Sequence, residues 1–360
     1  MSTEKEIIIK SDNIKFFAIE ALKSTSMSEE DAKTIADTLV ESELKGVYSH
    51  GIQLLPRYVR GLKNGINPKP NIKITNDSGP IATLDGDCGM GQIVSVEAMK
   101  LAIKKAKMHG TGIVVARNSN HLGALAYYGM MAASENMISM CTTNAASIMA
   151  PWGGTTETLG NNPICWTIPG DENNLVLLDM AVSTAARNKI RVAAAKGEQL
   201  PPDWAFDKDG QPTQDPQKAL DGLIAPMAGP KGFGLAVIME ILSGVLSGGL
   251  IGKELPRDAI SSTDIFYPTN TSHYFHVIDI SRFCPIDTFK QRIKELSKQI
   301  HESHLAKGTS QIFMPGEIEF KTRIKRLKAG IPISESVLIN LERLAKELNL
   351  SGLKKLTITR

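Results

Sequence analysis

Thr111-Gly112-Ile113-Val114-Val115-Ala116-Arg117 is the stretch that decides the fold, because its β-branched side chains are typical of a strand in the middle of a sheet. A polar loop, Asn118-Ser119-Asn120-His121-Leu122-Gly123, follows directly, and helical spacing of apolar residues resumes over 124–136. An α/β protein usually keeps its site in a loop between a buried strand and a helix. The sequence therefore predicts a functional site around residues 118–123.

Working outward, the rest of the chain alternates strands and helices. The predicted strands are 80–85, 137–143, 176–179, 274–279 and 311–314, and the predicted helices are 11–23, 28–45, 53–63, 92–109, 124–136, 235–246, 288–303 and 333–350. Ser28, followed three residues later by Asp31, is a plausible N-cap. The alternation predicts a layered α/β fold, with residues 198–216 as an excursion at the surface.

Length and composition limit the possible functions. A chain of 360 residues predicts roughly two domains. With 42% apolar and 22% charged residues, global disorder and coiled coil are excluded. A formal net charge of +3 gives no argument for nucleic acid or membrane as a partner, so we expect a small-molecule substrate. Cysteines 88, 141, 165 and 284 are scattered without zinc spacing and are expected to be reduced thiols, mostly buried.

No segment predicts export or membrane insertion. The N-terminus lacks a basic region that leads into a hydrophobic run. The most apolar segment, 234–250, is short for a membrane span and contains Glu240, so a buried helix is predicted there. We expect a cytoplasmic protein.

A second polar motif is Ser49-His50-Gly51, with Arg57 shortly after it. Imidazole changes charge near neutral pH, and a guanidinium group binds carboxylates with a fixed fork of donors. The combination suggests chemistry on a small carboxylate. A capping serine, a surface histidine and a solvated arginine are the alternative, and the motif alone does not decide between them.

The glycine-rich segments do not carry the common dinucleotide fingerprint. Gly86, Gly89 and Gly91 do not fit the G-x-G-x-x-G spacing, so a Rossmann domain is not predicted. Gly229-Pro230-Lys231-Gly232 stands directly before an apolar helix, where backbone donors and a lysine suit a phosphate group. A turn with a surface lysine is the alternative.

A set of motifs in order gives a family resemblance. The motifs are Ser49-His50-Gly51, 118–123, Ala150-Pro151-Trp152-Gly153-Gly154, Gly160-Asn161-Asn162-Pro163, Asp179-Met180-Ala181, 229–232 and Pro315-Gly316-Glu317. Together they resemble the type 2 malate/L-lactate dehydrogenase family, which includes ureidoglycolate dehydrogenase, L-sulfolactate dehydrogenase and diketogulonate reductase. The resemblance implies a non-Rossmann α/β fold of the L-sulfolactate dehydrogenase type, in which helices cover a central sheet. It also implies an N-terminal helical segment (1–75) packed with a C-terminal helical tail (320–360), and a binding domain over 76–319.

The resemblance further implies a cofactor, NAD or else NADP, and a homodimer with a shared active-site cleft. The expected cofactor contacts are Asp179, Met180, Ala181, Lys231, Gly232, Gly316, Glu317 and the backbone of Ala145. No metal is required.

The same resemblance assigns the catalytic residues. His121 is implied as the acid/base, with His50 orienting substrate or cofactor and Ser49 bonding nearby; the reverse assignment, with His50 as the proton carrier, stays open. Asn118 is a candidate substrate contact. Ser119 and Asn120 are interpreted as loop formers that bond their own backbone. The histidines at 109, 273, 276, 301 and 304 have no comparable context, and 301 and 304 are interpreted as a solvated face.

One position departs from the family pattern. Members commonly carry an arginine three residues after the glycine of the Ser-His-Gly motif, where this chain has Leu54. Leucine cannot donate a hydrogen bond, so Arg57, Arg187 or Lys189 is expected to bind the carboxylate, or the substrate presents a less charged group. Malate and lactate are therefore expected to be poor substrates.

The resulting prediction is hydride transfer between nicotinamide and a small 2-hydroxy or 2-oxo acid. One alternative is reduction of a cyclic imine 2-carboxylate on the same scaffold. The other is a cofactor-binding protein without catalysis.

Overall fold

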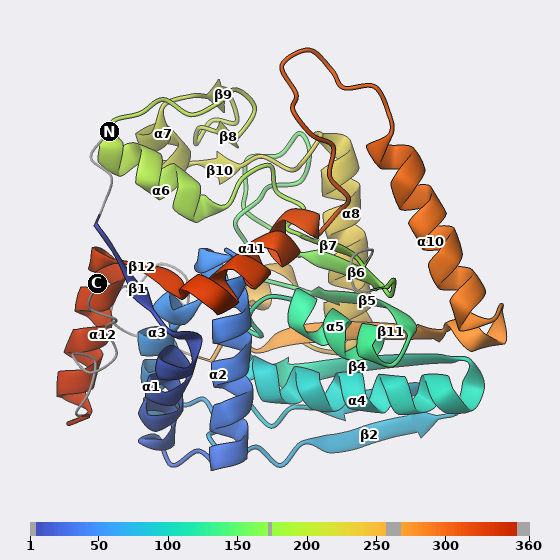
Figure 1. Cartoon of the computed structure of the whole chain (residues 1–360). Helices are drawn as coiled ribbons and strands as arrows, with labels where there is room; N and C mark the ends of the chain where they lie inside the picture. The colour runs from blue at the N-terminus through green and yellow to red at the C-terminus, as the bar shows by residue number, and fades with distance from the viewer. Residues whose placement is uncertain (1–4, 172–174, 257–267, 351–360) are drawn as a thin grey trace.

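A computed structural model describes residues 5–171, 175–256 and 268–350, and a seven-stranded mixed sheet forms its centre (Figure 1). The strand order is β2, β3, β4, β11, β5, β6, β7. The neighbours β3 and β4 run parallel, and the other neighbouring pairs are antiparallel. The predicted central strand is β4 (Thr111–Ser119), which lies between β3 and β11. The α/β prediction with a non-Rossmann central sheet is confirmed.

The strands are β1 (Glu6–Ile9), β2 (Lys73–Ser78), β3 (Ile81–Asp85), β4 (Thr111–Ser119), β5 (Met137–Thr143), β6 (Ile164–Ile168), β7 (Val176–Met180), β8 (Ala205–Phe206), β9 (Pro212–Thr213), β10 (Leu223–Ile224), β11 (Thr271–Asp279) and β12 (Ile331–Ser334). The helices are α1 (Ser11–Lys23), α2 (Glu29–Leu44), α3 (Leu55–Lys63), α4 (Gly91–His109), α5 (Ala126–Ser134), α6 (Arg187–Lys196), α7 (Pro216–Asp221), α8 (Pro230–Glu240), α10 (Ile286–His301), α11 (Glu317–Ala329) and α12 (Glu335–Glu347).

Both faces of the sheet are covered. On one face, α4 and α5 bury Met99 and Tyr128 against Phe275 of β11. On the other face, Met239 of α8 packs with Tyr274 of β11. Strands that are buried on both sides read as nearly continuous apolar runs, which is why the β-branched run of β4 predicted its place.

The N- and C-terminal segments build a separate helical core. Leu39 of α2, Tyr58 of α3 and Leu341 of α12 share one buried cluster, and β1 pairs antiparallel with β12 beside it (Figure 1). This is the smaller helical part that the resemblance implies. The domain boundaries at residues 75 and 320 stay a prediction.

Several sequence predictions need correction. The predicted strand 311–314 is wrong, since this segment forms no strand and ends at Pro315, whose carbonyl accepts from Leu177 N. Strand β2 and helix α11 were not predicted, because β2 is exposed along its whole length and α11 buries none of its residues. Without a buried stripe, neither segment shows apolar periodicity.

The apolar segment around α8 is also not fully buried. Leu235, Ile238, Ile241 and Val245 are 38%, 49%, 44% and 52% exposed, so one side of this helix faces outward. Within the described ranges, no helix is long and apolar enough to cross a membrane.

Candidate active site

The two histidines singled out in the sequence lie side by side. His121 is in the loop after β4, and His50 is in a 3-10 turn, Tyr48–His50, that precedes α3. Their rings stack with centroids 5.6 Å apart and an interplanar angle of 15°. The β4 loop and the turn of the helical part therefore meet at one site.

His121 is held through its Nδ1 atom. The hydroxyl group of Tyr58 lies 2.8 Å from Nδ1, and Gly123 N donates to the same atom at 3.3 Å. A backbone N–H can only donate, so Nδ1 accepts and the neutral ring carries its proton on Nε2. Sequence reasoning missed Tyr58, because its spacing with Leu55 and Leu62 on α3 is that of an ordinary core residue.

The site keeps His121 neutral at physiological pH. Burial lowers the pKa of His121 well below its ordinary value, and the charges of His50 and Arg57 lower it further. Burial also lowers the pKa of His50. Among the described residues, no carboxylate contributes to the shift of His121, so the surroundings of the ring suit an anionic ligand.

Neighbours of His121 in the loop fix the backbone from other segments. The Nδ2 of Asn120 donates to Cys88 O and Gly89 O at 3.1 and 2.9 Å, and its Oδ1 accepts from Thr269 N at 2.7 Å. The interpretation that Asn120 bonds its own backbone is wrong, because the side chain joins three chain segments. This buried amide makes the loop rigid.

Ser119 has a comparable role through a histidine that sequence reasoning set aside. His273 of β11 is fully buried, with Nε2 2.8 Å from Ser119 Oγ and Nδ1 2.8 Å from Thr143 Oγ1. Burial lowers the pKa of His273 to about 3, so the ring is neutral. The ring links β4 to β5 close to their ends, and thereby supports the loop that carries His121.

Ser49 and Leu54 complete the turn. Ser49 Oγ lies 2.9 Å from His50 Nδ1, which places the serine as predicted beside the histidine. Leu54 packs against the helical core.

The three candidate carboxylate donors differ in their surroundings. Arg57 is half-buried and close enough for its charge to act on Tyr58 and His121. Arg187 donates to Leu220 O at 2.9 Å and lies 3.6 Å from a carboxylate oxygen of Glu157, whereas Lys189 lies over the ring of Trp204. Only Arg57 of these three acts electrostatically on His121.

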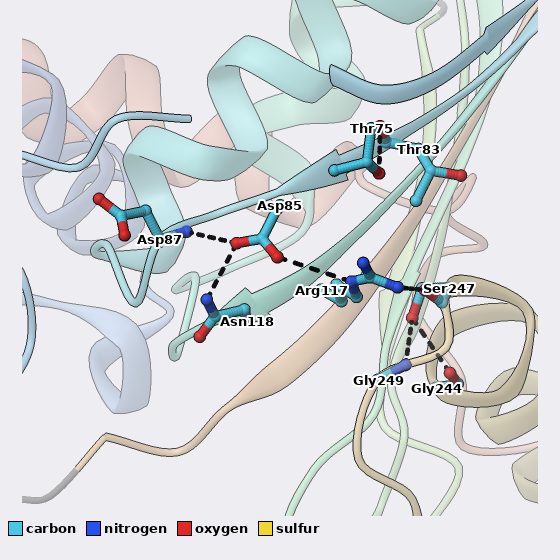
Figure 2. A network of polar contacts seen from close by, with 9 residues as sticks. All are labelled: Thr75, Thr83, Asp85, Asp87, Arg117, Asn118, Gly244, Ser247 and Gly249. Carbon is cyan, nitrogen blue, oxygen red and sulfur yellow. Dashed lines mark hydrogen bonds and ion pairs between the residues drawn. The ribbon is translucent and has the colours of Figure 1, made fainter. Parts of the chain in front are cut away.

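Asn118 belongs to a polar network at the ends of β3 and β4. Its Nδ2 donates to Asp85 Oδ1 at 2.9 Å, and Arg117 Nε lies 3.6 Å from Asp85 Oδ2 (Figure 2). Arg117 also donates to Ser247 O at 3.2 Å, in the segment after α8. The network therefore connects the start of the His121 loop to the segment that follows α8. A contact between Asn118 and substrate stays a prediction.

Asp179 lies at the end of β7 and faces the first turn of α5. Its Oδ2 accepts from Ala126 N at 2.8 Å. The side chain is exposed, yet the surrounding protein desolvates it and raises its pKa to about 6, against the opposing effects of Ala126 N–H and the charge of Lys45. Asp179 thus has part of its surface available to a ligand.

Gly316 and Glu317 lie next to the same strand. Leu177 N of β7 donates to Pro315 O at 3.0 Å, and a Cβ atom on Gly316 would lie 2.7 Å from Leu177 Cβ. Although burial opposes it, hydrogen bonds from Lys321 and His301 lower the pKa of Glu317 to about 2. The solvated-face interpretation of His301 is therefore incomplete, since its Nε2 lies 2.8 Å from the Glu317 carboxylate.

The other predicted cofactor residues, among them Ala145 and Lys231, lie in or next to α8. Ala145 N donates to Asn162 Oδ1 at 3.0 Å, and Asn162 Nδ2 donates to Glu240 at 2.8 Å. Met227 N donates to Val182 O at 2.9 Å, which brings the start of α8 next to the Asp179-Met180-Ala181 segment. Lys231 is exposed in the first turn of α8, and no ion pair with it is found among the described residues. This surface suits a phosphate group.

The described part of the chain holds no group of three or more His, Cys, Asp or Glu side chains that could bind a metal ion.

The site combines the neutral His121 ring, the nearby Arg57 guanidinium and the exposed Lys231 at the start of α8, on a sheet that is not of the Rossmann type. This combination fits an enzyme of the dehydrogenase class. The family model for malate/L-lactate dehydrogenase matches residues 9–342. The chain belongs to this family, whose members are dehydrogenases that act on CH–OH groups.

Known proteins resemble the chain over almost its whole length. The solved structure of sulfolactate dehydrogenase from Methanocaldococcus jannaschii is 41% identical with a TM-score of 0.88, covering 96% of this chain and 98% of that one. Malate dehydrogenase of Pyrococcus horikoshii is 40% identical over 97% of this chain and 98% of its own length. The structure of delta1-piperideine-2-carboxylate reductase from Pseudomonas syringae is 26% identical with a TM-score of 0.83, covering 94% and 99%.

Proposed function

We propose that this chain transfers hydride between a nicotinamide cofactor and a small 2-hydroxy or 2-oxo acid, with His121 as the acid/base. The observation that carries the proposal is the neutral His121 ring, bonded to Tyr58 and flanked by His50 and Arg57. A positioned imidazole contributes about 10²–10⁴-fold in rate when it moves a proton in the transition state.

A nicotinamide cofactor, when bound, would supply the hydride acceptor for the hydroxyl-bearing carbon, and the hydride donor in the reverse direction. In oxidation, the neutral ring takes the tautomer with its proton on Nδ1, which Tyr58 accepts, so that Nε2 is free to take the hydroxyl proton; in reduction, the protonated ring returns a proton from Nε2 to the carbonyl oxygen. The Tyr58 hydroxyl can donate to Nδ1 or accept from it, so it stays bonded in both protonation states. His50 stacks on the same ring and excludes water from one of its faces.

Arg57 is the proposed carboxylate donor. A guanidinium binds a carboxylate with two parallel hydrogen bonds, and Leu54 offers none. Because Leu54 stands where family members commonly carry an arginine, a substrate with a second negative group, such as malate, is expected to bind weakly.

NAD is the proposed cofactor, with NADP as the alternative. Lys231 and the N–H groups at the start of α8 would hold a phosphate, and Asp179 and Gly316 would line the adjoining surface. Glu317 is ionised, so it would bond ribose hydroxyls and repel a 2′-phosphate.

A homodimer is proposed as the working form. The outward side of α8 and of the π-helical turn Ile241–Val245 that continues it presents Leu235, Ile238, Ile241 and Val245, and the charged Glu240 within this stretch is buried. A continuous apolar helix face of this kind is typical of an interface. It begins beside Lys231, so a second copy would adjoin the cofactor surface.

A cytoplasmic location remains part of the proposal.

A binding and turnover assay tests the proposal. NADH fluorescence should change on binding, and NADH should be oxidised when pyruvate, glyoxylate or another 2-oxo acid is added. Lys231→Ala should weaken NADH binding, whereas Lys253→Ala, at an exposed position after the same helix, should not. Turnover with a cyclic imine 2-carboxylate alone would favour the alternative reaction, which the Pseudomonas reductase supports. Binding without turnover on any substrate would favour a non-catalytic protein.

A further inference from the structure

A buried carboxyl group lies under the turn that carries His50. Glu43 is in the last turn of α2 and is 2% exposed. Its Oε1 accepts a hydrogen bond from Ile52 N at 2.9 Å. Since Ile52 directly follows Ser49-His50-Gly51, this bond ties the turn to α2.

Gly51 makes room for the carboxyl group. A Cβ atom at this position would lie 2.0 Å from Oε1 of Glu43 and 2.4 Å from its Cδ. The φ angle of Gly51 is −90°, which other residues adopt, so contact with Glu43 is what requires glycine here. The Ser-His-Gly motif and Glu43 are therefore matched to each other.

The second carboxyl oxygen of Glu43, Oε2, is buried without a hydrogen bond from the described residues. Burial raises the pKa of Glu43 to about 7, although Ile52 N–H and the charge of Arg326 oppose the shift. A buried ionisable group with a single hydrogen bond destabilises a fold, so its presence calls for a functional reason.

Few other charges face Glu43. Arg326 of α11 donates to the Glu43 backbone carbonyl and lies over the ring of Tyr48. On α2 itself, Glu41 is engaged by Arg323 through two hydrogen bonds of 2.8 Å, and Lys45 lies 4.0 Å from Glu41. On the turn, the titratable groups are Tyr48 and His50.

We propose that Glu43 is a positioning residue, whose neutral carboxyl group holds the Ser49–His50 turn against His121 and whose ionisation loosens it. Opening of the turn would expose the carboxyl group to water, where the ionised form is favoured, whereas the closed turn buries it with one hydrogen bond and favours the neutral form. The neutral form therefore fixes the turn, and with it the stacked pair of histidines. The inference rests on the proposed function only in assigning a catalytic task to that pair.

Glu43→Gln tests the proposal kinetically, with Glu30→Gln as the control on an exposed position of the same helix. At pH 8 the KM for the 2-oxo acid should be about tenfold lower in Glu43→Gln than in wild type, because the amide stays neutral and can still accept from Ile52 N, whereas the wild-type carboxyl group is ionised. As the pH falls below 6, the KM values of Glu43→Gln and wild type should converge. Glu30→Gln should follow wild type throughout. A KM ratio of Glu43→Gln to wild type that stays constant with pH would overturn the proposal.

Amide hydrogen exchange gives a second test that needs no substrate. In the wild-type protein, protection of the Ile52 amide, corrected for intrinsic exchange, should decrease as the pH rises through about 7. Glu43→Gln should keep its protection at all pH values. Protection of Ile52 that does not change with pH in the wild type would contradict the proposal, even if no substrate has been found and no variant folds.

Discussion

The two segments that bring the histidines together are held in different ways. The β4 loop around His121 is held by neutral groups, namely the Asn120 amide and the His273 ring, whose pKa is about 3. The turn around His50 is held by Glu43, a carboxyl group whose pKa is about 7. One side of the site is therefore independent of pH in the physiological range, and the other side changes within it.

The difference follows from where the segments come from. The β4 loop lies at the end of a sheet, where backbone groups of several strands supply donors and acceptors for neutral side chains. The turn follows the C-terminal end of α2 and lies against α11, and the Glu43 carboxyl group supplies the side-chain acceptor for Ile52 N. We infer that the sheet side fixes the chemistry and the helical side adjusts the alignment of substrate.

Separate replacement of the two histidines should give the largest difference between the β4 loop and the His50 turn. His121→Asn should lower kcat for 2-oxo acid reduction by about 10³-fold, because the proton carrier is lost, whereas His50→Asn should cost about tenfold or less through misalignment. Because the pKa of His121 is lowered, oxidation of the hydroxy acid should remain active in wild type below pH 6.5. Rates measured at saturating cofactor would contradict the assignment if His50→Asn were the more damaged variant.

Leu54→Arg changes only the His50 turn and should alter the substrate specificity of the site. Restoring a guanidinium beside His50 should raise kcat/KM for oxaloacetate by about 10-fold to 100-fold, since a charge-assisted bond to a carboxylate contributes roughly 1.5–3 kcal/mol. Leu54→Met is the matched control, because it keeps the packing against the helical core. Equal kinetics for both variants would remove Leu54 as a specificity determinant.

Asn120→Ala should damage the sheet side without introducing pH dependence. Loss of a buried amide that joins three backbone segments should reduce the free energy of unfolding by about 2–3 kcal/mol. The loss should be the same at pH 6 and pH 8, because no titrating group is involved. Urea denaturation of Asn120→Ala and wild type at pH 6 and pH 8 checks this. A loss of unfolding free energy that differs between the two pH values would contradict the claim that the β4 loop is held by neutral groups.

Glu43→Gln should show the opposite behaviour in stability. The folded-state pKa of Glu43 is raised from 4.5 to about 7, so its contribution to stability is fully present below pH 4.5 and is lost as the pH rises through 7. Relative to Glu43→Gln, the wild type should lose about 3 kcal/mol across this window. Parallel stability curves for wild type, Glu43→Gln and Glu30→Gln would mean that the carboxyl group does not titrate as described.

The sequence predicts secondary structure where buried side chains recur at the period of a strand or a helix. It does not predict contacts between residues that are far apart in the chain. The β-branched run of β4 and the capped helix α2 were predictable from local pattern, and Ser28 does accept from Asp31 N. Tyr58 and His121 meet across 63 positions, so no local signal marks that pair. Glutamate is almost never fully buried, so the residue type of Glu43 gives no sign of its burial under the turn.

Transfer of deuterium from the cofactor tests the central claim most directly. NADH labelled with deuterium at the transferring position of nicotinamide C4 is incubated with the protein and a panel of 2-oxo acids, and each 2-hydroxy product is analysed by mass spectrometry. The proposal predicts a product one mass unit heavier, with the label on C2, and a loss of its formation by about 10³-fold in His121→Asn while NADH binding is retained. Unlabelled product, or undiminished transfer in His121→Asn, would contradict it.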